Sequence, residues 1–462
     1  IQWTHGSQAW RWRALAWPPR RANPRRKTKR LCGRYMQRAA LRCQKSIAAR
    51  PAIPRQPPPH HSMETLMPSH DPVICAPVRT AIGAFGGSLK NVPASDLGAI
   101  AIKAVLERAG LAPDRIDTVI MGQVLQAGAG MNPARQAAIG AGLPVNVPAM
   151  TVNRVCGSGA QAVITAAQDV MLGHAACAVA GGMENMDQAP FLLGKARYGY
   201  RLGDGALIDS LLNDGLNDAF SGEHSGWHTE DLAEQNQISR AAQDAWALRS
   251  QSRFSKAQSE GLFDAEIVPV EMKTRKGISA FDRDEHNRPD TTLDSLAHLK
   301  PAFREHGTIT AGNAPGLNAG AAAMIVADRA WAETNQLQPA VRIAGMGVGA
   351  VDPGLFGLGP VPAVKQALEQ AAWPLASVER VEINEAFAAI AVALVGELGF
   401  PEDIVNVEGG AIAHGHPIGA TGAILTVRLI HAMQRDNLKR GIVTLCIGGG
   451  QGVALALERI PS

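Results

Sequence analysis

The sequence lacks several features that would assign it to a familiar class. No apolar stretch approaches the roughly 20 residues that cross a bilayer, because Gly, Pro or charged residues interrupt the longest ones. The six cysteines contain no C-x-x-C pair, and a chain of 462 residues does not need disulfide bonds for stability. We therefore expect no transmembrane helix, no metal site and reduced thiols in a cytoplasmic protein.

Acidic residues are nearly missing from the start of the chain, since residues 1–66 hold fifteen Lys or Arg and one acid, Glu64. The rest carries 30 basic and 40 acidic side chains, a net charge of −10 that does not favour nucleic acid. The Arg, Pro and Trp of residues 1–66 predict a disordered leader. A mitochondrial transit peptide, a nucleic-acid tail and an extension translated upstream of the true start all fit. We favour the last, with Met63 or Met67 as the start.

From Val73 onwards, apolar runs of strand length alternate with the three-to-four spacing of helices. In the first half we expect a helix from Ser95 or Asp96 to Gly110, a helix over 160–172, and strands over 118–121, 150–153 and 175–180. Roughly the last 120 residues show the same alternation of strands and helices. We expect helices over 385–398 and 419–433 and strands over 378–383, 441–446 and 452–457. This order predicts two similar α/β halves with mainly parallel sheets covered by helices. A polar stretch over 187–317, with a helix over 240–260, is expected to be an insertion that carries specificity.

A Cys-Gly-Ser-Gly sequence places Cys156 in a turn between an expected strand and an expected helix. The helix dipole and free backbone N–H groups at a helix start stabilise a thiolate, so we expect a lowered pKa and a nucleophilic Cys156. Gly157 and Gly159 would allow a tight turn and a close approach of a substrate carbonyl. The alternative is a buried, inert cysteine, which is our interpretation of Cys75 and Cys177.

A second Gly-rich loop contains two histidines, His414 and His416. No Asp, Glu or Cys at a usual metal-ligand spacing accompanies them, so a base is favoured over a metal ligand. His416, held between Gly415 and Pro417, could take a proton from a cysteine and return it later. A packed loop histidine is the alternative, and it is the better interpretation of His414.

Two further segments carry groups that could stabilise negative charge. The glycines after Cys446 expose backbone N–H groups that could form an oxyanion hole or a phosphate site, although most Gly-rich turns are simple hairpins. Asn384 stands at the carboxyl end of an expected strand, where α/β ligand sites usually form. It could instead be only the N-cap of the following helix.

Together, these segments resemble the thiolase family, whose pattern is Cys-Gly-Ser-Gly, Asn-Glu-Ala-Phe, a Gly-His-Pro loop and a late Cys followed by glycines. All four occur in that order, and the resemblance covers residues 71–459. It implies an α/β fold of duplicated β-α-β-α-β-α-β-β halves, packed as five α-β-α-β-α layers. The N-terminal half would be 67–186 with 318–338, the C-terminal half 339–462, and the loop domain 187–317 would bind CoA and form tetramer contacts. Further matching segments are 79–87, 181–185 and 310–313.

The resemblance implies an acyl-CoA C-acyltransferase of fatty acid metabolism, either an acetyl-CoA C-acetyltransferase or a 3-ketoacyl-CoA thiolase. Cys156 would carry the acyl group after His416 takes its proton, and Cys446 would remove a proton from the second acyl-CoA. His416 and a water held by Asn384 would form one oxyanion hole, and the N–H groups of Cys156 and Gly448 the other. Acetyl-CoA, 3-ketoacyl-CoA and CoA would be the reactants, with no metal or redox cofactor.

The resemblance also assigns CoA contacts by position, with Arg288 near the nucleotide and His224 near the pantetheine. Each contact could instead be an ordinary loop residue. The full set is His224, Arg288, Ser295, Leu299, Ala314 and Phe387. The sequence departs from the family pattern at four positions expected to flank the acyl and pantetheine pocket, where Ser225 and Phe356 replace Met, Pro315 replaces Ser and Ala319 replaces Asp. The acyl-chain preference is therefore open.

Two other functions are compatible with this kind of fold. A decarboxylating, ketoacyl-synthase-like condensing enzyme would lack a second catalytic cysteine, so Cys446 argues against it. A non-catalytic homologue that binds acyl-CoA or lipid would be expected to have lost Cys156, His416 or Cys446, and the sequence keeps all three. The resemblance further implies a homodimer, or a homotetramer because 195–218 resembles the family's tetramerisation loop. No nucleic-acid or membrane partner is expected, and only a genuine transit peptide would place the protein in mitochondria.

Overall fold

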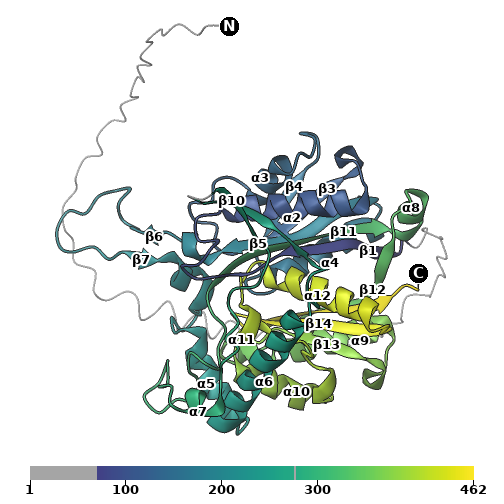
Figure 1. The fold of residues 1–462 in the computed structure, drawn as a ribbon. Helices are drawn as coiled ribbons and strands as arrows, with labels where there is room; N and C mark the ends of the chain where they lie inside the picture. The colour runs from purple at the N-terminus through teal and green to yellow at the C-terminus, as the bar shows by residue number, and fades with distance from the viewer. Residues whose placement is uncertain (1–69, 275–276, 462) are drawn as a thin grey trace, which may run out of the picture. The chain divides into compact units, whose positions relative to one another are not determined.

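The computed structural model describes residues 70–274 and 277–461 (Figure 1). The leader predicted over 1–66, with the start at Met63 or Met67, lies outside these residues. No helix within the described residues is both long and apolar enough to span a bilayer. The cysteines that the structure describes are all free.

The N-terminal half forms a sheet layer in the order β4-β3-β5-β11-β1. Its strands are β1 Pro72–Thr80, β3 Thr118–Gly122, β4 Ala149–Val152, β5 Cys177–Asn185 and β11 Asn318–Asp328. Helices α2 Ala94–Ala109 and α3 Pro133–Gly140 pack on its outer face. Although β11 follows the long loop region in sequence, it lies between β1 and β5, so the sheet is completed only by this late segment.

The C-terminal half forms a second layer in the order β12-β15-β14-β13. Its strands are β12 Pro339–Ala350, β13 Arg380–Ile383, β14 Arg440–Ile447 and β15 Gln451–Arg459. Helices α9 Pro360–Ala371 and α10 Ala388–Leu398 cover its outer side. Short elements complete the two halves: β2 Gly83–Ala84, α8 Arg329–Thr334 and α11 Ala411–His414.

Helices α4 Ser158–Met171 and α12 Thr421–Arg435 lie between the two sheet layers (Figure 1). Their apolar side chains, such as Val163 and Ile424, share one core with the inner faces of both layers, where Met324 and Leu455 point. Separate cores lie under the outer helices of each half. The predicted five-layer α-β-α-β-α order is therefore confirmed, and burying each helix pair against a sheet explains it physically.

The two layers are hydrogen-bonded to each other, because β1 pairs with β12 at Val73↔Arg342 and Ile74↔Val341. The pairing is also more mixed than predicted. Strand β3 runs parallel to β4 and β5, and β13 to β14, whereas β1, β11, β12 and β15 pair antiparallel. The prediction of mainly parallel sheets was wrong, because β11 returns from beyond the loop region to pair antiparallel with β1 and β5, and because β14 and β15 form an antiparallel hairpin.

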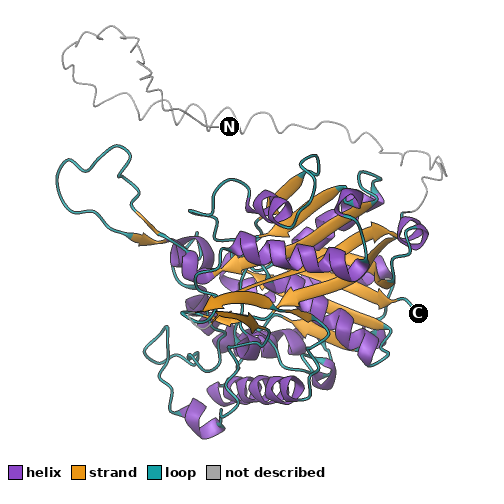
Figure 2. Ribbon diagram, turned by 45° about the horizontal axis from the view of Figure 1, so that its top comes forward, coloured by secondary structure: helices purple, strands orange, loops and turns teal. Residues whose placement is uncertain are grey.

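The predicted insertion holds several short elements and one long helix, α6, close to the predicted 240–260. Its elements are β6 Phe191–Leu192, β7 Ile208–Asp209, the π-helix Leu212–Leu216, α5 Ser225–Gln235, α6 Arg240–Ser259, β8 Ile267–Val268, β9 Val270–Thr274, β10 Gly277–Phe281 and α7 Leu293–Ala297. Residues 193–207, between β6 and β7, extend away from the layers as an arm (Figure 2).

Helix ends were predicted better than helix starts. Gly110 and Gly399 end α2 and α10 in the left-handed region, with φ of +61° and +73°, as their sequence positions indicated. The start of α2 was wrong, because Pro93 is its N-cap and no side chain caps it. Helix α10 begins at Ala388 rather than 385, since residues 384–387 form an irregular segment needed at the site.

Candidate active site

A cavity of about 420 Å³ draws its walls from both halves and from the loop region. Most of the residues singled out from the sequence line it or lie directly behind its wall. Those that line it are Cys156, His224, Ala314, Phe387, His416 and Gly448. The cavity is therefore the candidate active site.

Cys156 follows β4 in a tight turn and stands just before α4, whose N-cap is Gly157. Val155 has a φ of +43°, a costly conformation for a β-branched residue. Ser158 holds the turn, because its hydroxyl accepts the Arg154 N–H at 2.8 Å and donates to Val155 O at 2.7 Å. The turn leaves Cys156 as a whole residue half-buried and places it in the wall of the cavity.

Glycines bring the starts of α4 and α12 into backbone contact. A Cβ at Gly159 would lie 2.6 Å from Ala423 N, and one at Gly422 would lie 2.4 Å from Ala160 N. Neither approach is possible for a residue with a side chain, so a substitution would push the two helices apart. This packing role was not predicted, and it places Cys156 and His416 at neighbouring helix starts.

The pKa of the Cys156 thiol is raised to about 11, mainly because the group is buried. The backbone N–H groups of Gly448 and Cys156 donate to the sulfur and lower the pKa, while the carboxylate of Glu184 raises it. The expectation of a lowered pKa was wrong, because desolvation outweighs the helix N-terminus. Cys156 is thus a thiol at neutral pH and needs a base before it can attack.

The buried imidazole of His416 is held in one tautomer. Its Nδ1 lies 2.7 Å from Thr421 Oγ1, and the Thr421 hydroxyl donates to Pro417 O at 2.9 Å. Because that hydroxyl has only one hydrogen, Nδ1 must carry a proton and donate to it. Burial lowers the pKa of His416 to about 4, so the ring is neutral and Nε2 can accept a proton.

Asn384 is fully buried and lies 3.4 Å from His416 Nε2 through its Nδ2. It is not a helix N-cap, because Phe387 holds that position in α10. Its Oδ1 has no hydrogen-bond partner in the part of the chain that the structure describes. The adjacent Glu385 fixes the segment by accepting from Trp246 Nε1 at 2.9 Å and from a second side chain of α6, Ser250, at 2.7 Å.

The glycines after Cys446 form the hairpin between β14 and β15, as the simpler interpretation anticipated. Gly449 and Gly450 have φ of +83° and +84°, which glycine adopts without strain. The same hairpin directs the N–H of Gly448 at the Cys156 sulfur. It therefore closes a sheet and also supplies a polar group to the site.

Cys446 is fully buried and stands behind the lining of the cavity. Burial first, and then the charge of a Cys156 thiolate, raise its pKa well above the ordinary value. Its thiol therefore holds its proton at neutral pH, and the thiolate, once formed, is a strong base.

The candidate CoA contacts divide between two adjoining cavities. Arg288, Ser295 and Leu299 line a second cavity of about 430 Å³. This cavity shares Ala311 and Ala314 with the first. The predicted contacts therefore lie in two cavities that share part of their lining.

Two of these residues also have structural roles. His224 is the N-cap of α5, where its Nδ1 accepts the Gly226 N–H at 3.0 Å, and its ring stacks on Phe303 with centroids 4.6 Å apart. Burial lowers its pKa. Ser295 and Thr292 form a capping box at the start of α7. The alternative of ordinary loop residues thus has structural support for Ser295.

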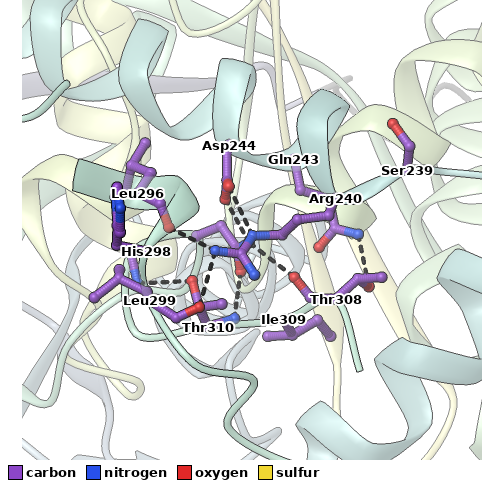
Figure 3. A network of polar contacts seen from close by, with 12 residues as sticks. Ser239, Arg240, Gln243, Asp244, Leu296, His298, Leu299, Thr308, Ile309 and Thr310 are labelled. Atoms are coloured by element: carbon purple, nitrogen blue, oxygen red, sulfur yellow. Dashed lines mark hydrogen bonds and ion pairs between the residues drawn. The ribbon is translucent and has the colours of Figure 1, made fainter. Parts of the chain in front are cut away.

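Helix α6 is hydrogen-bonded to residues 296–310 (Figure 3). This stretch includes residues that line the first cavity and residues that line the second. Arg240 pairs with Asp244 Oδ2 at 2.6 Å along the helix and donates to Leu299 O at 3.1 Å. Gln243 Nε2 donates to Thr308 Oγ1 at 2.9 Å. These bonds fix the backbone on either side of the path between the cavities.

Glu184 is buried near the site. It belongs to segment 181–185, which matches the family pattern, but the sequence predicted no role for it. It accepts the N–H groups of Val124 at 2.9 Å and of Gly419 at 3.0 Å, which ties β5 to the loop that carries His416. Burial raises its pKa to about 7, although these backbone donors lower it. A buried acid at the end of an apolar strand was the signal that could have identified it.

The structure also places the other residues discussed from the sequence. Ser225, Pro315 and Phe356 line the cavity, as expected for positions that shape an acyl pocket. Ala319 lies inside β11 and does not itself line the cavity. His414 is buried against Phe254, with ring centroids 6.0 Å apart. The described residues contain no group of three or more His, Cys, Asp or Glu suited to hold a metal ion.

The chain is similar in sequence to known proteins. The family description "Thiolase, N-terminal domain" matches residues 72–330, and "Thiolase, C-terminal domain" matches 337–459. The chain is 53% identical over 390 residues to an acetyl-CoA acetyltransferase of Cupriavidus necator, covering 84% of this chain and 99% of that protein. It is 51% identical over 389 residues to the acetyl-CoA acetyltransferase of Escherichia coli, with the same coverage.

The chain is also similar in fold to solved structures of two proteins. The acetyl-CoA acetyltransferase of Bacillus anthracis is similar with a TM-score of 0.83 and 44% identity, covering 85% of this chain and 99% of that one. Human mitochondrial 3-ketoacyl-CoA thiolase is similar with a TM-score of 0.83 and 40% identity over the same shares.

Proposed function

The chain belongs to the thiolase family and is an acyltransferase, and from this premise we propose that it condenses two acetyl-CoA molecules to acetoacetyl-CoA and CoA. The reverse reaction would be thiolysis of a 3-ketoacyl-CoA. The observation that carries the proposal is the pairing, in one cavity, of a thiol that needs a base with an imidazole whose Nε2 is unprotonated. The names of the relatives support acetyl-CoA as the substrate.

In the first half of the reaction, the Cys156 sulfur attacks the thioester carbonyl while His416 Nε2 accepts the thiol proton. The C–S bond to CoA then breaks, and the departing CoA thiolate takes the proton of Cys446. Acetyl-Cys156, free CoA and a Cys446 thiolate result, with the proton of Cys156 on His416. The raised pKa of Cys156 supports this order, because a thiol with a pKa of about 11 is not deprotonated without a base.

In the second half, the Cys446 thiolate removes a proton from the α-carbon of a second acetyl-CoA. The carbanion attacks the acetyl carbonyl, a C–C bond forms, and the bond to the Cys156 sulfur breaks. His416 returns its proton to Cys156, so both cysteines end as thiols. The strongly raised pKa of Cys446 supports a base of this kind, since a weakly basic thiolate could not take a carbon-bound proton.

Two sets of donors would stabilise the negative charge. The N–H groups of Gly448 and Cys156 would hold the tetrahedral intermediate at Cys156, which their present bonds to the sulfur support. The enolate oxygen of the second substrate would be held at His416, with a water on Asn384, whose Oδ1 lacks a protein partner among the described residues. Loss of one such donor typically costs about 10²- to 10³-fold in rate.

Coenzyme A would enter through the second cavity. Its nucleotide would lie near Arg288, and its pantetheine would pass Ala311 and Ala314 to reach His224 and Phe387. The two residues that line both cavities, Ala311 and Ala314, support this path. CoA thioesters are then substrates, and the proposed chemistry uses no metal or redox cofactor.

The domain limits follow the same proposal, with halves at 67–186 plus 318–338 and at 339–462 and a loop domain at 187–317. We propose that the arm within this loop domain joins subunits into a tetramer of a cytoplasmic enzyme. Tyr198 and Leu202 on the arm are 92% and 100% exposed, which favours a protein contact. Light scattering of a variant without residues 194–206 should detect a smaller oligomer.

The function can be tested on the nucleophile directly. Brief incubation with acetyl-CoA, followed by peptide mass spectrometry, should find one acetyl group on the peptide that contains Cys156. An acetyl group on another cysteine would disprove the assignment of the nucleophile. Absence of any label, with no acetoacetyl-CoA formed, would refute the proposed function.

A further inference from the structure

The two ends of the catalytic cavity differ in chemistry. One part of its wall, on the proposed CoA side, contains Ala311 and Ala314, which also line the second cavity. A second part of the wall, here called the polar end, contains Asp218 and His228, which do not line the second cavity. Neither residue was singled out from the sequence, and the proposed reaction does not use them.

Close approaches place this polar end beside the glycine hairpin. A Cβ at Gly449 would lie 3.8 Å from the Phe220 ring, and one at Gly354 would lie 3.6 Å from His228 Nδ1. Pro353, next to Gly354, also lines the cavity. Because Gly448 of this hairpin and Cys156 both line the cavity, the polar end and the sulfur proposed to carry the acyl group belong to one cavity.

A hydrogen bond orients the His228 ring through one nitrogen and leaves the other nitrogen without a hydrogen-bond partner among the described residues. Ser221 Oγ donates to Asp218 Oδ2 at 2.9 Å and lies 2.7 Å from His228 Nε2. Since the single Ser221 hydrogen is used on the carboxylate, His228 Nε2 must donate to Ser221 Oγ. His228 Nδ1 makes no hydrogen bond to the described residues, and in the neutral ring it carries a lone pair.

The order of contacts excludes a hydrolytic triad. In such a triad the histidine stands between serine and carboxylate and takes the serine proton. Here Ser221 stands between Asp218 and His228, and its proton goes to the carboxylate. Ser221 is therefore a positioning residue, and the group presented to the cavity is the imidazole.

The surrounding charge favours a neutral partner over an anion. Among the described residues that line the cavity, Asp214 and Asp218 are acidic, and none is Lys or Arg. Asp218 is buried, and its Oδ1 has no hydrogen-bond partner in the described part of the chain. A carboxylate on the acyl group would meet like charge. A hydroxyl is neutral and can donate to a lone pair while accepting elsewhere.

We propose that this end of the cavity selects short acyl groups that carry a hydroxyl, with His228 Nδ1 accepting the hydrogen of the substrate hydroxyl. Asp218 and Ser221 hold the ring for this bond, and Ser225, which also lines the cavity, adds polarity to the same wall. The inference rests on the proposed acylation of Cys156 and names the class of acyl group that Cys156 takes in addition to acetyl.

The test compares matched acyl-CoA pairs that differ only by hydroxyl against methyl: glycolyl-CoA with propionyl-CoA, and 3-hydroxypropionyl-CoA with butyryl-CoA. The second-order rate constant for acylation of Cys156 is measured by CoA release and by protein mass. We expect the hydroxyl member to react about 10-fold faster in at least one pair, the effect of one well-made hydrogen bond. In His228→Leu this ratio should fall about 10-fold.

Controls separate binding from folding. His228→Gln, which keeps an acceptor, should retain a higher ratio than His228→Leu. His174→Leu removes a histidine that is 69% exposed and should leave the ratio unchanged. If His228→Leu does not fold, Ser221→Ala tests the same ratio by releasing the ring.

Four outcomes would count against the inference or against the proposed function. Faster reaction of the methyl member in both pairs, or an unchanged ratio in His228→Leu, would overturn the inference. If acetyl-CoA labels Cys156 while neither hydroxyacyl-CoA does, the inference fails and the proposed function stands. If acetyl-CoA does not label Cys156, the proposed function itself fails.

Discussion

The Thr421 hydroxyl decides which nitrogen of His416 carries the proton, so its removal should damage the base without touching the nucleophile. In Thr421→Val, the shape of the side chain is nearly kept, but His416 Nδ1–H loses its acceptor at 2.7 Å. The ring can then shift its proton to Nε2, the nitrogen that is proposed to accept the proton of Cys156. Acylation should slow, because the useful tautomer is no longer favoured.

The size of the effect follows from burial. An unsatisfied buried polar group costs about 1–3 kcal/mol, which corresponds to about 5- to 150-fold in a rate constant. His416 and Thr421 are 6% and 0% exposed, so solvent cannot replace the lost acceptor, and the upper part of that range applies. The measurement is the pre-steady-state rate of CoA release from acetyl-CoA, with protein mass as a check on the acetyl-enzyme.

The chain offers a close control in the same helix. Thr426 is also buried, and its hydroxyl donates to Gly422 O at 2.8 Å without contacting a histidine. Thr426→Val should therefore lose a similar amount of stability and keep its acylation rate, while Thr421→Ser should act like the unmodified enzyme. An acylation rate of Thr421→Val within about two-fold of the unmodified rate would refute the tautomer argument.

The remaining predictions concern the second cysteine, the pH profile and the leader. Cys446→Ala should still be acetylated at Cys156 but should lose condensation and thiolysis by orders of magnitude, measured as label stoichiometry beside turnover; normal turnover would require another base. Because burial holds the pKa of His416 at about 4, below its ordinary 6.5, its neutral form persists as the pH falls through 6.5 and is lost only near 4. Protonation of His416 should therefore not slow acylation between about pH 5.5 and 9, as followed by stopped-flow, and an inflection near 6.5 that persists in Glu184→Gln, which removes the nearby carboxyl with a pKa of about 7, would contradict the burial argument. A chain that starts at Met67 should match the full chain in turnover and melting temperature, and a large loss in either would show that residues 1–66 contribute to the fold.

The sequence predicted those site residues whose surroundings are local in the chain. Cys156 and His416 each stand in a Gly-rich turn before a helix, and a few adjacent residues are enough to predict such a turn. The contacts that tune them are distant in sequence. Glu184 reaches Gly419 across 235 positions, so no local pattern could reveal that bond.

Energy balances were harder to predict than positions. The helix start at Cys156 was recognised, yet the sign of its pKa shift was not, because desolvation depends on packing from both halves. The start of α10 was missed for a related reason. Helical periodicity extends to Glu385, but the bonds of Glu385 to α6 hold residues 384–387 out of the helix.

The position of β1 has a consequence for synthesis of the protein. Its neighbours β11 and β12 lie about 250 residues further along the chain, as the pairing of Pro72 with Asp328 shows. At about 5–20 residues per second, a ribosome needs on the order of 10–50 s to supply them, and β1 has unpaired edges for that time. The nascent chain should therefore depend on chaperones until residue 350 has emerged. A nonsense mutation within the loop region should yield an aggregating fragment rather than a folded half.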